Sequence, residues 1–86
     1  MSIQEKEALS SWAVEMRLVK SFLHVERSKR AAVILNRVVK ETDERMSDWA
    51  DDVKLAEKFL NQKKPEHVIA ILDRVIEEMV RSILDD

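Results

Sequence analysis

The sequence predicts one all-α domain over residues 1–86, and three observations favour this prediction. The chain has no glycine and one proline, although β-hairpin turns usually need glycine or an Asn-Gly pair. Hydrophobic residues make up 45% of the chain and charged residues 37%, a mixture typical of amphipathic helices and not of disordered chains. Apolar residues also recur every three or four positions. A chain of this length buries one thin core.

The first predicted helix begins at Ile3. Ser2 and Glu5 have the S-x-x-E spacing of a capping box, in which both side chains satisfy free backbone N–H groups. Its apolar positions alternate steps of three and four: Leu9, Trp12, Met16, Val19 and Leu23. We expect this helix to end between Val25 and Lys29, with Ser28 as the N-cap of the next one.

The second predicted helix is a long central one, from about 28 to 61. Its apolar stripe passes through the polar stretch VVKETDERMSDWADDV, 38–53, without a change of phase. The members of the stripe are Ala32, Leu35, Val39, Thr42, Met46, Trp49, Val53, Ala56 and Leu60. This favours a three-helix arrangement. The alternative is a break near 42–48, with Ser47 capping a new helix from Asp48, which would give a four-helix bundle.

The last predicted helix follows the polar connection NQKK and has Pro65 in its first turn, where a missing N–H is harmless. Its apolar residues are Val68, Ile69, Leu72, Val75, Ile76, Met79, Val80, Ile83 and Leu84. This stripe is too broad for a single neighbouring helix. We therefore expect a homodimer or a complex with another helical protein.

Few residues suit catalysis or cofactor binding. The chain has no cysteine, no glycine-rich phosphate loop, and two histidines, His24 and His67, without a carboxylate at metal-site spacing. An acidic row of Glu41, Glu44, Asp48 and Asp51 would share one face of a continuous helix, and we interpret it as a solvated face. We expect no enzyme activity, no cofactor and no metal site.

The location expected for this chain is the cytoplasm. The N-terminal stretch MSIQEKEALS has no basic segment followed by an apolar one. The longest apolar run, Ala31 to Leu35, is far shorter than the roughly 20 residues that span a bilayer.

Charge is distributed unevenly along the chain. Residues 16–40 contain seven basic residues against one acidic residue, Glu26. Four residues form a basic row at helical spacing, Arg17, Lys20, His24 and Arg27, and Lys29 and Arg30 extend it. This row could neutralise the acidic row within the molecule or across a dimer, dock an acidic protein partner, or contact nucleic-acid phosphates. The pI of 5.7 and the lack of interleaved aromatic residues weigh against nucleic acid.

The stretch AEKFLNQKKPEHVIAILDRVI, 56–76, resembles the helix–turn–helix of a tetratricopeptide-type repeat. It lacks the family's small residues at the helix contact, with Val68 where alanine is usual. No second copy lies at that family's repeat period, so we assign no family.

Together these observations predict a small protein-binding regulator or adaptor, of an inhibitor or chaperone-like kind, that acts as a homodimer or within a hetero-complex. The alternative is a nucleic-acid-binding helical dimer that uses the basic row. The predicted contact residues are Arg17, Lys20, Arg27 and Arg30, and an outer apolar face of the last helix that includes Val68, Val75 and Val80.

Overall fold

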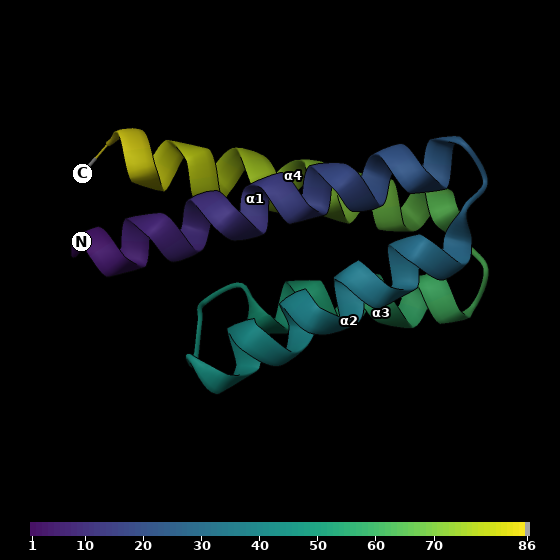
Figure 1. Ribbon diagram of the computed structural model, residues 1–86, viewed down its shortest axis with the longest axis horizontal. Helices are drawn as coiled ribbons and strands as arrows, with labels where there is room; N and C mark the ends of the chain where they lie inside the picture. The colour runs from purple at the N-terminus through teal and green to yellow at the C-terminus, as the bar shows by residue number, and fades with distance from the viewer. Residues whose placement is uncertain (86) are drawn as a thin grey trace.

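The computed structural model describes residues 1–85, in which four α-helices form an antiparallel bundle (Figure 1). The helices are α1 Ile3–His24, α2 Ser28–Glu44, α3 Ala50–Asn61 and α4 Pro65–Leu84. The prediction of an all-α chain is confirmed. α2 and α3 are the shorter helices, so α1 and α4 extend beyond the turn that joins α2 to α3 (Figure 1).

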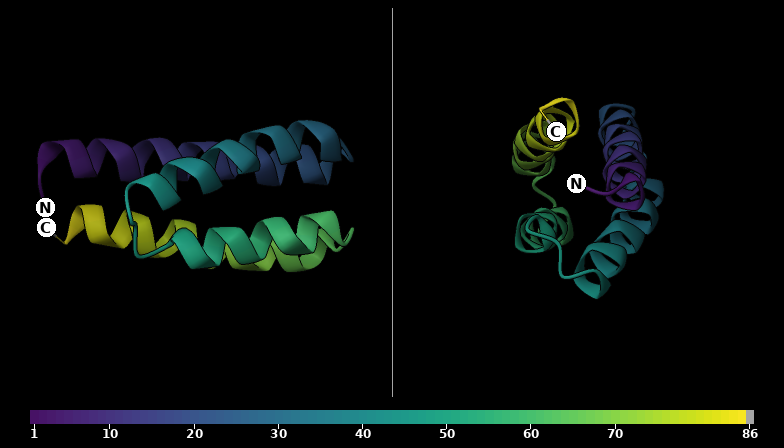
Figure 2. Two further views of the ribbon diagram at one scale, coloured as in Figure 1. Left: turned by 90° about the horizontal axis from the view of Figure 1, so that it is seen from below. Right: turned by 90° about the vertical axis from the view of Figure 1, so that its left-hand side faces the viewer.

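The four helices stand at the corners of a square. α1 and α3 each pack against α2 and α4, and an end-on view places α1 and α3 on one diagonal (Figure 2). The core between them takes fully buried side chains from every helix, including Met16, Leu35, Val53 and Leu72. Both chain termini lie at one end of the bundle, and the α1–α2 and α3–α4 turns lie at the other (Figures 1 and 2).

Several predicted helix boundaries are confirmed. The backbone N–H of Glu5 donates to Ser2 Oγ at 3.1 Å, and α1 begins at Ile3. α1 ends at His24, just before the predicted range. Pro65 is the first residue of α4, where a proline costs no hydrogen bond.

The continuous helix over 28–61 was wrong, and the alternative break is the one observed. α2 ends at Glu44, the chain reverses, and α3 begins at Ala50. Ser47 does not cap a helix from Asp48, because α3 begins two residues later with Trp49 as its N-cap, but the Ser47 Oγ accepts the N–H of Trp49 within the turn at 3.2 Å. Met46, which continues the apolar stripe in sequence, is 89% exposed. The regular apolar spacing over 32–60 therefore arises from two separate helices and does not indicate one continuous helix.

Three helices end in the same way although the chain has no glycine. One residue after each C-cap adopts a left-handed backbone: Glu26 (φ 59°), Met46 (φ 53°) and Lys63 (φ 60°). The following N–H then donates to the carbonyl five residues back, as in Ser47 to Thr42 at 2.9 Å. These are the hydrogen bonds of a Schellman motif, whose left-handed position is usually glycine. A search for glycine therefore misses these helix ends.

The structure reveals an internal repeat with an offset of 37 residues, the separation of Trp12 and Trp49. We call α1–α2 hairpin 1 and α3–α4 hairpin 2. Residues identical at this offset include Trp12/Trp49, Ala13/Ala50, Leu18/Leu55, Phe22/Phe59, Leu23/Leu60, Ile34/Ile71, Leu35/Leu72, Arg37/Arg74, Val38/Val75 and Glu41/Glu78. The sequence analysis missed this repeat because it tested only the tetratricopeptide period.

Side-chain contacts repeat along with the residues. The indole Nε1 of Trp12 donates to Glu41 at 2.9 Å, and that of Trp49 donates to Glu78 at 3.0 Å. The ion pair of Arg37 with Glu15, at 2.7 Å, recurs as Arg74 with Asp52, at 3.1 Å. Because α1 corresponds to α3 and α2 to α4, the hairpins are related by a pseudo-two-fold axis along the bundle.

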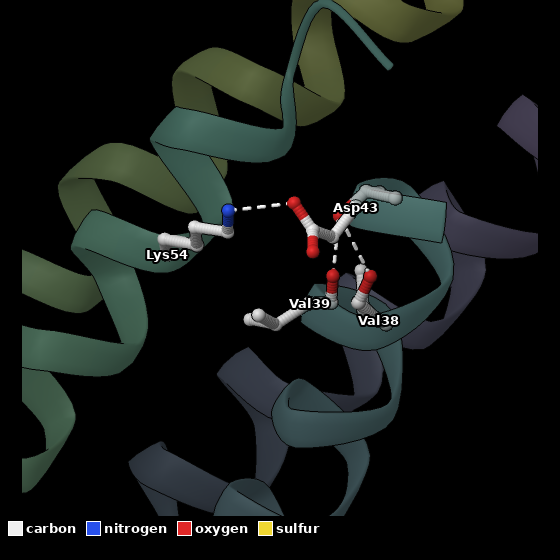
Figure 3. A network of polar contacts seen from close by, with 5 residues as sticks. Val38, Val39, Asp43 and Lys54 are labelled. Carbon is white, nitrogen blue, oxygen red and sulfur yellow. Dashed lines mark hydrogen bonds and ion pairs between the residues drawn. The ribbon is translucent and has the colours of Figure 1, made fainter. Parts of the chain in front are cut away.

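Polar contacts stabilise the end of α2, and one of them joins α2 to α3 (Figure 3). Thr42 is fully buried, and its hydroxyl donates to the carbonyls of Val38 at 2.8 Å and Val39 at 3.0 Å. The Lys54 ammonium donates to Asp43 Oδ1 at 2.6 Å. This hydrogen bond and the charge of Asp43 raise the pKa of Lys54 above its ordinary value of 10.5. The ion pair therefore stabilises the folded state at pH values below the ordinary lysine pKa of 10.5, and this stabilisation is lost as the pH rises through the raised pKa.

The turn at Met46 yields a prediction about stability. Met46→Gly should raise the free energy of unfolding by up to about 1 kcal/mol, because glycine tolerates the left-handed backbone and the exposed side chain packs little. Urea denaturation measures the change. Val33→Gly, at an exposed position inside α2, should instead lower it by about 1 kcal/mol. A loss of stability in both variants would contradict this account of the turn.

The Trp–Glu hydrogen bonds yield a second prediction. Glu41→Ala should lower the free energy of unfolding by about 1–3 kcal/mol, because the indole N–H of the buried Trp12 then lacks its acceptor. Chemical denaturation followed by tryptophan fluorescence measures the loss. Glu44→Ala, one turn away and exposed, should change stability by less than about 0.5 kcal/mol. Equal effects of the two variants would show that the hydrogen bond contributes nothing.

Candidate functional site

The predicted basic row does not form one free surface. Arg17 is exposed on α1, but Lys20 forms an ion pair with Asp73 of α4, which leaves its side chain 27% exposed. Arg27 lies beyond α1, as the N-cap residue of α2. The row thus divides between the side of the bundle, where Lys20 joins α1 to α4, and its end, where Arg27 and Arg30 are exposed.

The outer apolar face predicted for α4 was wrong for two of its three residues. Val68 and Val75 are fully buried in the core, and Val80 is half-buried against it. The reason is the number of neighbours. α4 packs against both α1 and α3, so its broad stripe is covered within the chain. The breadth of this stripe therefore gives no support to self-association.

The acidic row is also dispersed. Because α2 ends at Glu44, Asp48 and Asp51 lie beyond that helix, in the turn and in α3. Glu41 is occupied by the indole of Trp12. Among residues 1–85, no group of three or more acidic or histidine side chains is placed to hold a metal ion.

The topology instead creates a cluster of cations at one end of the bundle. Both αα-turns lie there, at 25–27 and 62–64 (Figures 1 and 2). We call this cluster the basic tip, and its residues, all exposed, are Arg27, Lys29, Arg30, Lys63 and Lys64. Within 24–30 and 61–67 these five cations meet two acidic residues, Glu26 and Glu66, for a net charge of +3.

The charges of the basic tip are not neutralised by ion pairs within residues 1–85. Several cations elsewhere form ion pairs, among them Lys20, Arg37, Lys54, Arg74 and Arg81, whereas other cations outside the tip, such as Arg17 and Lys40, lie apart from one another along the chain. None of the five cations of the tip forms an ion pair within the described part of the chain. Lys64 instead lies 5.9 Å from the ring centroid of Phe59, a cation–π distance that leaves its charge accessible.

Fold stability does not explain these charges. α2 and α4 both begin at the tip, with Arg27 and Lys64 as N-cap residues and no side-chain cap hydrogen bond. A helix N-terminus carries partial positive charge, so cations there are unfavourable and Ser, Thr, Asp or Asn would serve the helix better. The first turn of α2 contains no acidic residue. α4 has Glu66 in its first turn, and the C-termini of α1 and α3, where cations are favourable, lie at the same end, so the helix dipoles neither require nor exclude the basic tip.

Sequence reasoning found three of the five residues of this cluster. It named Arg27, Lys29 and Arg30 but not Lys63 and Lys64, because a helix over 28–61 would have placed the two turns at opposite ends. The 37-residue repeat was the missed signal, since it pairs Arg27 with Lys64.

The opposite end of the bundle has a groove of about 550 Å³ where α1 and α4 outrun the α2–α3 turn. Half of its lining residues are apolar, among them Leu9, Trp12, Met46 and Trp49, and its charged residues, Glu5, Arg45 and Asp48, are of both signs. The basic tip is thus the stronger candidate for a functional surface.

In the described range, no helix has both the length and the apolar character needed to cross a membrane. Comparison of the chain with protein-family models, with curated proteins and with solved structures finds no match, so its function has to be inferred from the geometry described above.

Proposed function

We propose that this protein is a small cytoplasmic adaptor or regulator that binds an acidic segment of a protein partner at the basic tip. The observation that carries the proposal is the group of five exposed cations that two αα-turns bring together without an intramolecular partner. Unpaired charge of one sign raises the association rate and selects partners of the opposite sign. The activity is stoichiometric binding and not catalysis.

The dimensions of the tip suit a short acidic peptide better than nucleic acid. The bundle is only 22 × 17 Å across, and its sides carry acidic residues such as Asp51, Asp73 and Glu77, which are exposed. An extended polyphosphate chain would pass from the tip onto these carboxylates. Phe59, the aromatic residue nearest the tip, is half-buried beneath His67 and offers no free stacking platform.

A hetero-complex fits the proposal better than a homodimer. The expectation of self-association came from an apolar stripe on α4, which α1 and α3 cover within the chain. Two basic tips would also repel each other. The acidic segment is therefore supplied by a different protein.

Charge reversal at the tip tests the proposal. The triple variant Arg27→Glu, Arg30→Glu and Lys64→Glu should weaken binding of a synthetic Glu/Asp-rich helical peptide at least about tenfold, because each exposed charge contributes roughly 0.2–1 kcal/mol. Fluorescence anisotropy at about 50 mM salt measures the affinity, and higher salt should weaken wild-type binding. Circular dichroism should show unchanged helicity.

A matched control reverses the same number of charges nearer the other end, at exposed positions: Lys40→Glu, Arg45→Glu and Arg81→Glu. Its binding should stay within about threefold of wild type, allowing for the altered net charge. Equal weakening in both triple variants would overturn the assignment to the tip. Tighter binding of an oligonucleotide than of the peptide, with the same dependence on the tip, would favour the nucleic-acid alternative.

A further inference from the structure

The internal repeat supplies a control for what the fold itself requires. Both hairpins build the same core and repeat the same Trp–Glu and Arg–carboxylate contacts. Outward positions make no such contacts and are free to differ between the hairpins. An exposed apolar residue of hairpin 1 whose counterpart in hairpin 2 is polar or smaller is therefore not needed by the fold.

Such residues gather on hairpin 1. Val14, Val25 and Val33 are 56%, 61% and 71% exposed. Their counterparts in hairpin 2 are Asp51, Gln62 and Ala70, two polar residues and one smaller residue. The fold accommodates those replacements at equivalent positions, so the three valines serve another purpose. Exposed apolar residues that are grouped in this way mark interaction surfaces.

The exposed apolar residues of hairpin 1 also include Leu18, which is 45% exposed. Val14, Leu18 and Val25 follow one another at helical spacing on the side of α1 away from the core. The ion pair of Glu15 with Arg37 sets the register of the antiparallel helices, and one turn closer to the tip lie Leu18 on α1 and Val33 on α2. We call these four residues, Val14, Leu18, Val25 and Val33, the hairpin 1 face.

The hairpin 1 face leads directly into the basic tip. Val25 is two residues before Arg27, and Val33 lies one helical turn after Lys29 and Arg30. Hairpin 2 has Lys64, Glu66 and His67 at the positions of Arg27, Lys29 and Arg30, so one charge is kept, one is reversed and one is replaced by histidine. The exposed valines and all three of these cations therefore occur together on hairpin 1 only.

We infer that the acidic segment bound by this protein is an amphipathic helix, whose apolar side packs on the hairpin 1 face while its carboxylates meet the basic tip. This inference rests on the proposed function. Charge complementarity identifies the occupant, because the apolar stripe continues into five unpaired cations. The distance from Val14 to Val25 is about 17 Å at 1.5 Å per residue, which corresponds to three turns of a partner helix.

A pair of matched substitutions tests the inference. Leu18 and Leu55 are the same residue at equivalent positions, 45% and 40% exposed. The probe is a synthetic 14-residue peptide with leucine at i, i+3, i+4 and i+7 and glutamate between. Leu18→Ser should weaken its binding at least about fivefold, and Leu55→Ser should leave the affinity unchanged, because only Leu18 lies on the hairpin 1 face.

A second variant distinguishes a loss of the binding surface from a loss of the fold. Val25→Gln with Val33→Ala gives hairpin 1 the residues that hairpin 2 already carries at those positions, and it changes no charge. It should weaken peptide binding about tenfold with unchanged helicity. A peptide with serine in place of leucine, at the same charge, should bind the wild type about as weakly as the normal peptide binds this variant.

Several results would overturn the inference. They are equal effects of Leu18→Ser and Leu55→Ser, full affinity for the serine peptide, or self-association by light scattering that Leu18→Ser abolishes, which would make a second copy the occupant. If binding then still depends on the basic tip, the proposed function stands without the amphipathic helix. If neither tip nor face affects binding, both proposals fail.

Discussion

The reversal of the chain between Glu44 and Ala50 decides where every surface of the molecule lies. With α2 and α3 joined as one rod, the turns at 25–27 and 62–64 would lie about 50 Å apart, at 1.5 Å per residue. The reversal brings them to the same end of the bundle. It requires a left-handed Met46, which costs roughly 1–2 kcal/mol. The hydrogen bond from Ser47 to Thr42 and the pairing of Lys54 with Asp43 offset part of that cost.

The repeat separates what the fold needs from what it permits. Tryptophan, its glutamate acceptor and the central leucine and valine recur in both hairpins, since each hairpin can bury its apolar face only against the other. Surface charge has diverged at the junctions between hairpins. Lys20 meets Asp73 on one side, and the equivalent positions on the other side are Glu57 and Asn36, whose side chains also touch. The two positions remain in contact although lysine is replaced by glutamate and aspartate by asparagine. The placement of these residues therefore matters more than the sign of their charges.

Local signals in the sequence were sufficient for some features and not for others. Ser2 and Pro65 mark helix starts through interactions within a few residues, and both were predicted. The break at Met46 was not preferred, because Thr42, Met46 and Trp49 keep helical spacing and the turn lacks glycine. From that error came two more, since a three-helix layout left Val68 and Val75 uncovered and separated Arg27 from Lys63. Comparison of the chain with itself at an offset of 37 residues would have corrected all three.

Helix starts differ between the two ends of the bundle. At the end with the chain termini, α1 starts with a serine cap and Glu5 in its first turn, and α3 starts with Asp51 and Asp52. Those residues suit the helix dipole. At the tip, α4 has Glu66 in its first turn but α2 has no acidic residue there, and Arg27 and Lys64 stand at N-cap positions without cap hydrogen bonds. The C-termini of α1 and α3, which favour cations, lie at the same end. Because these dipole effects oppose each other, they do not account for five cations without carboxylate partners, and the proposed anionic partner would relieve the repulsion among them.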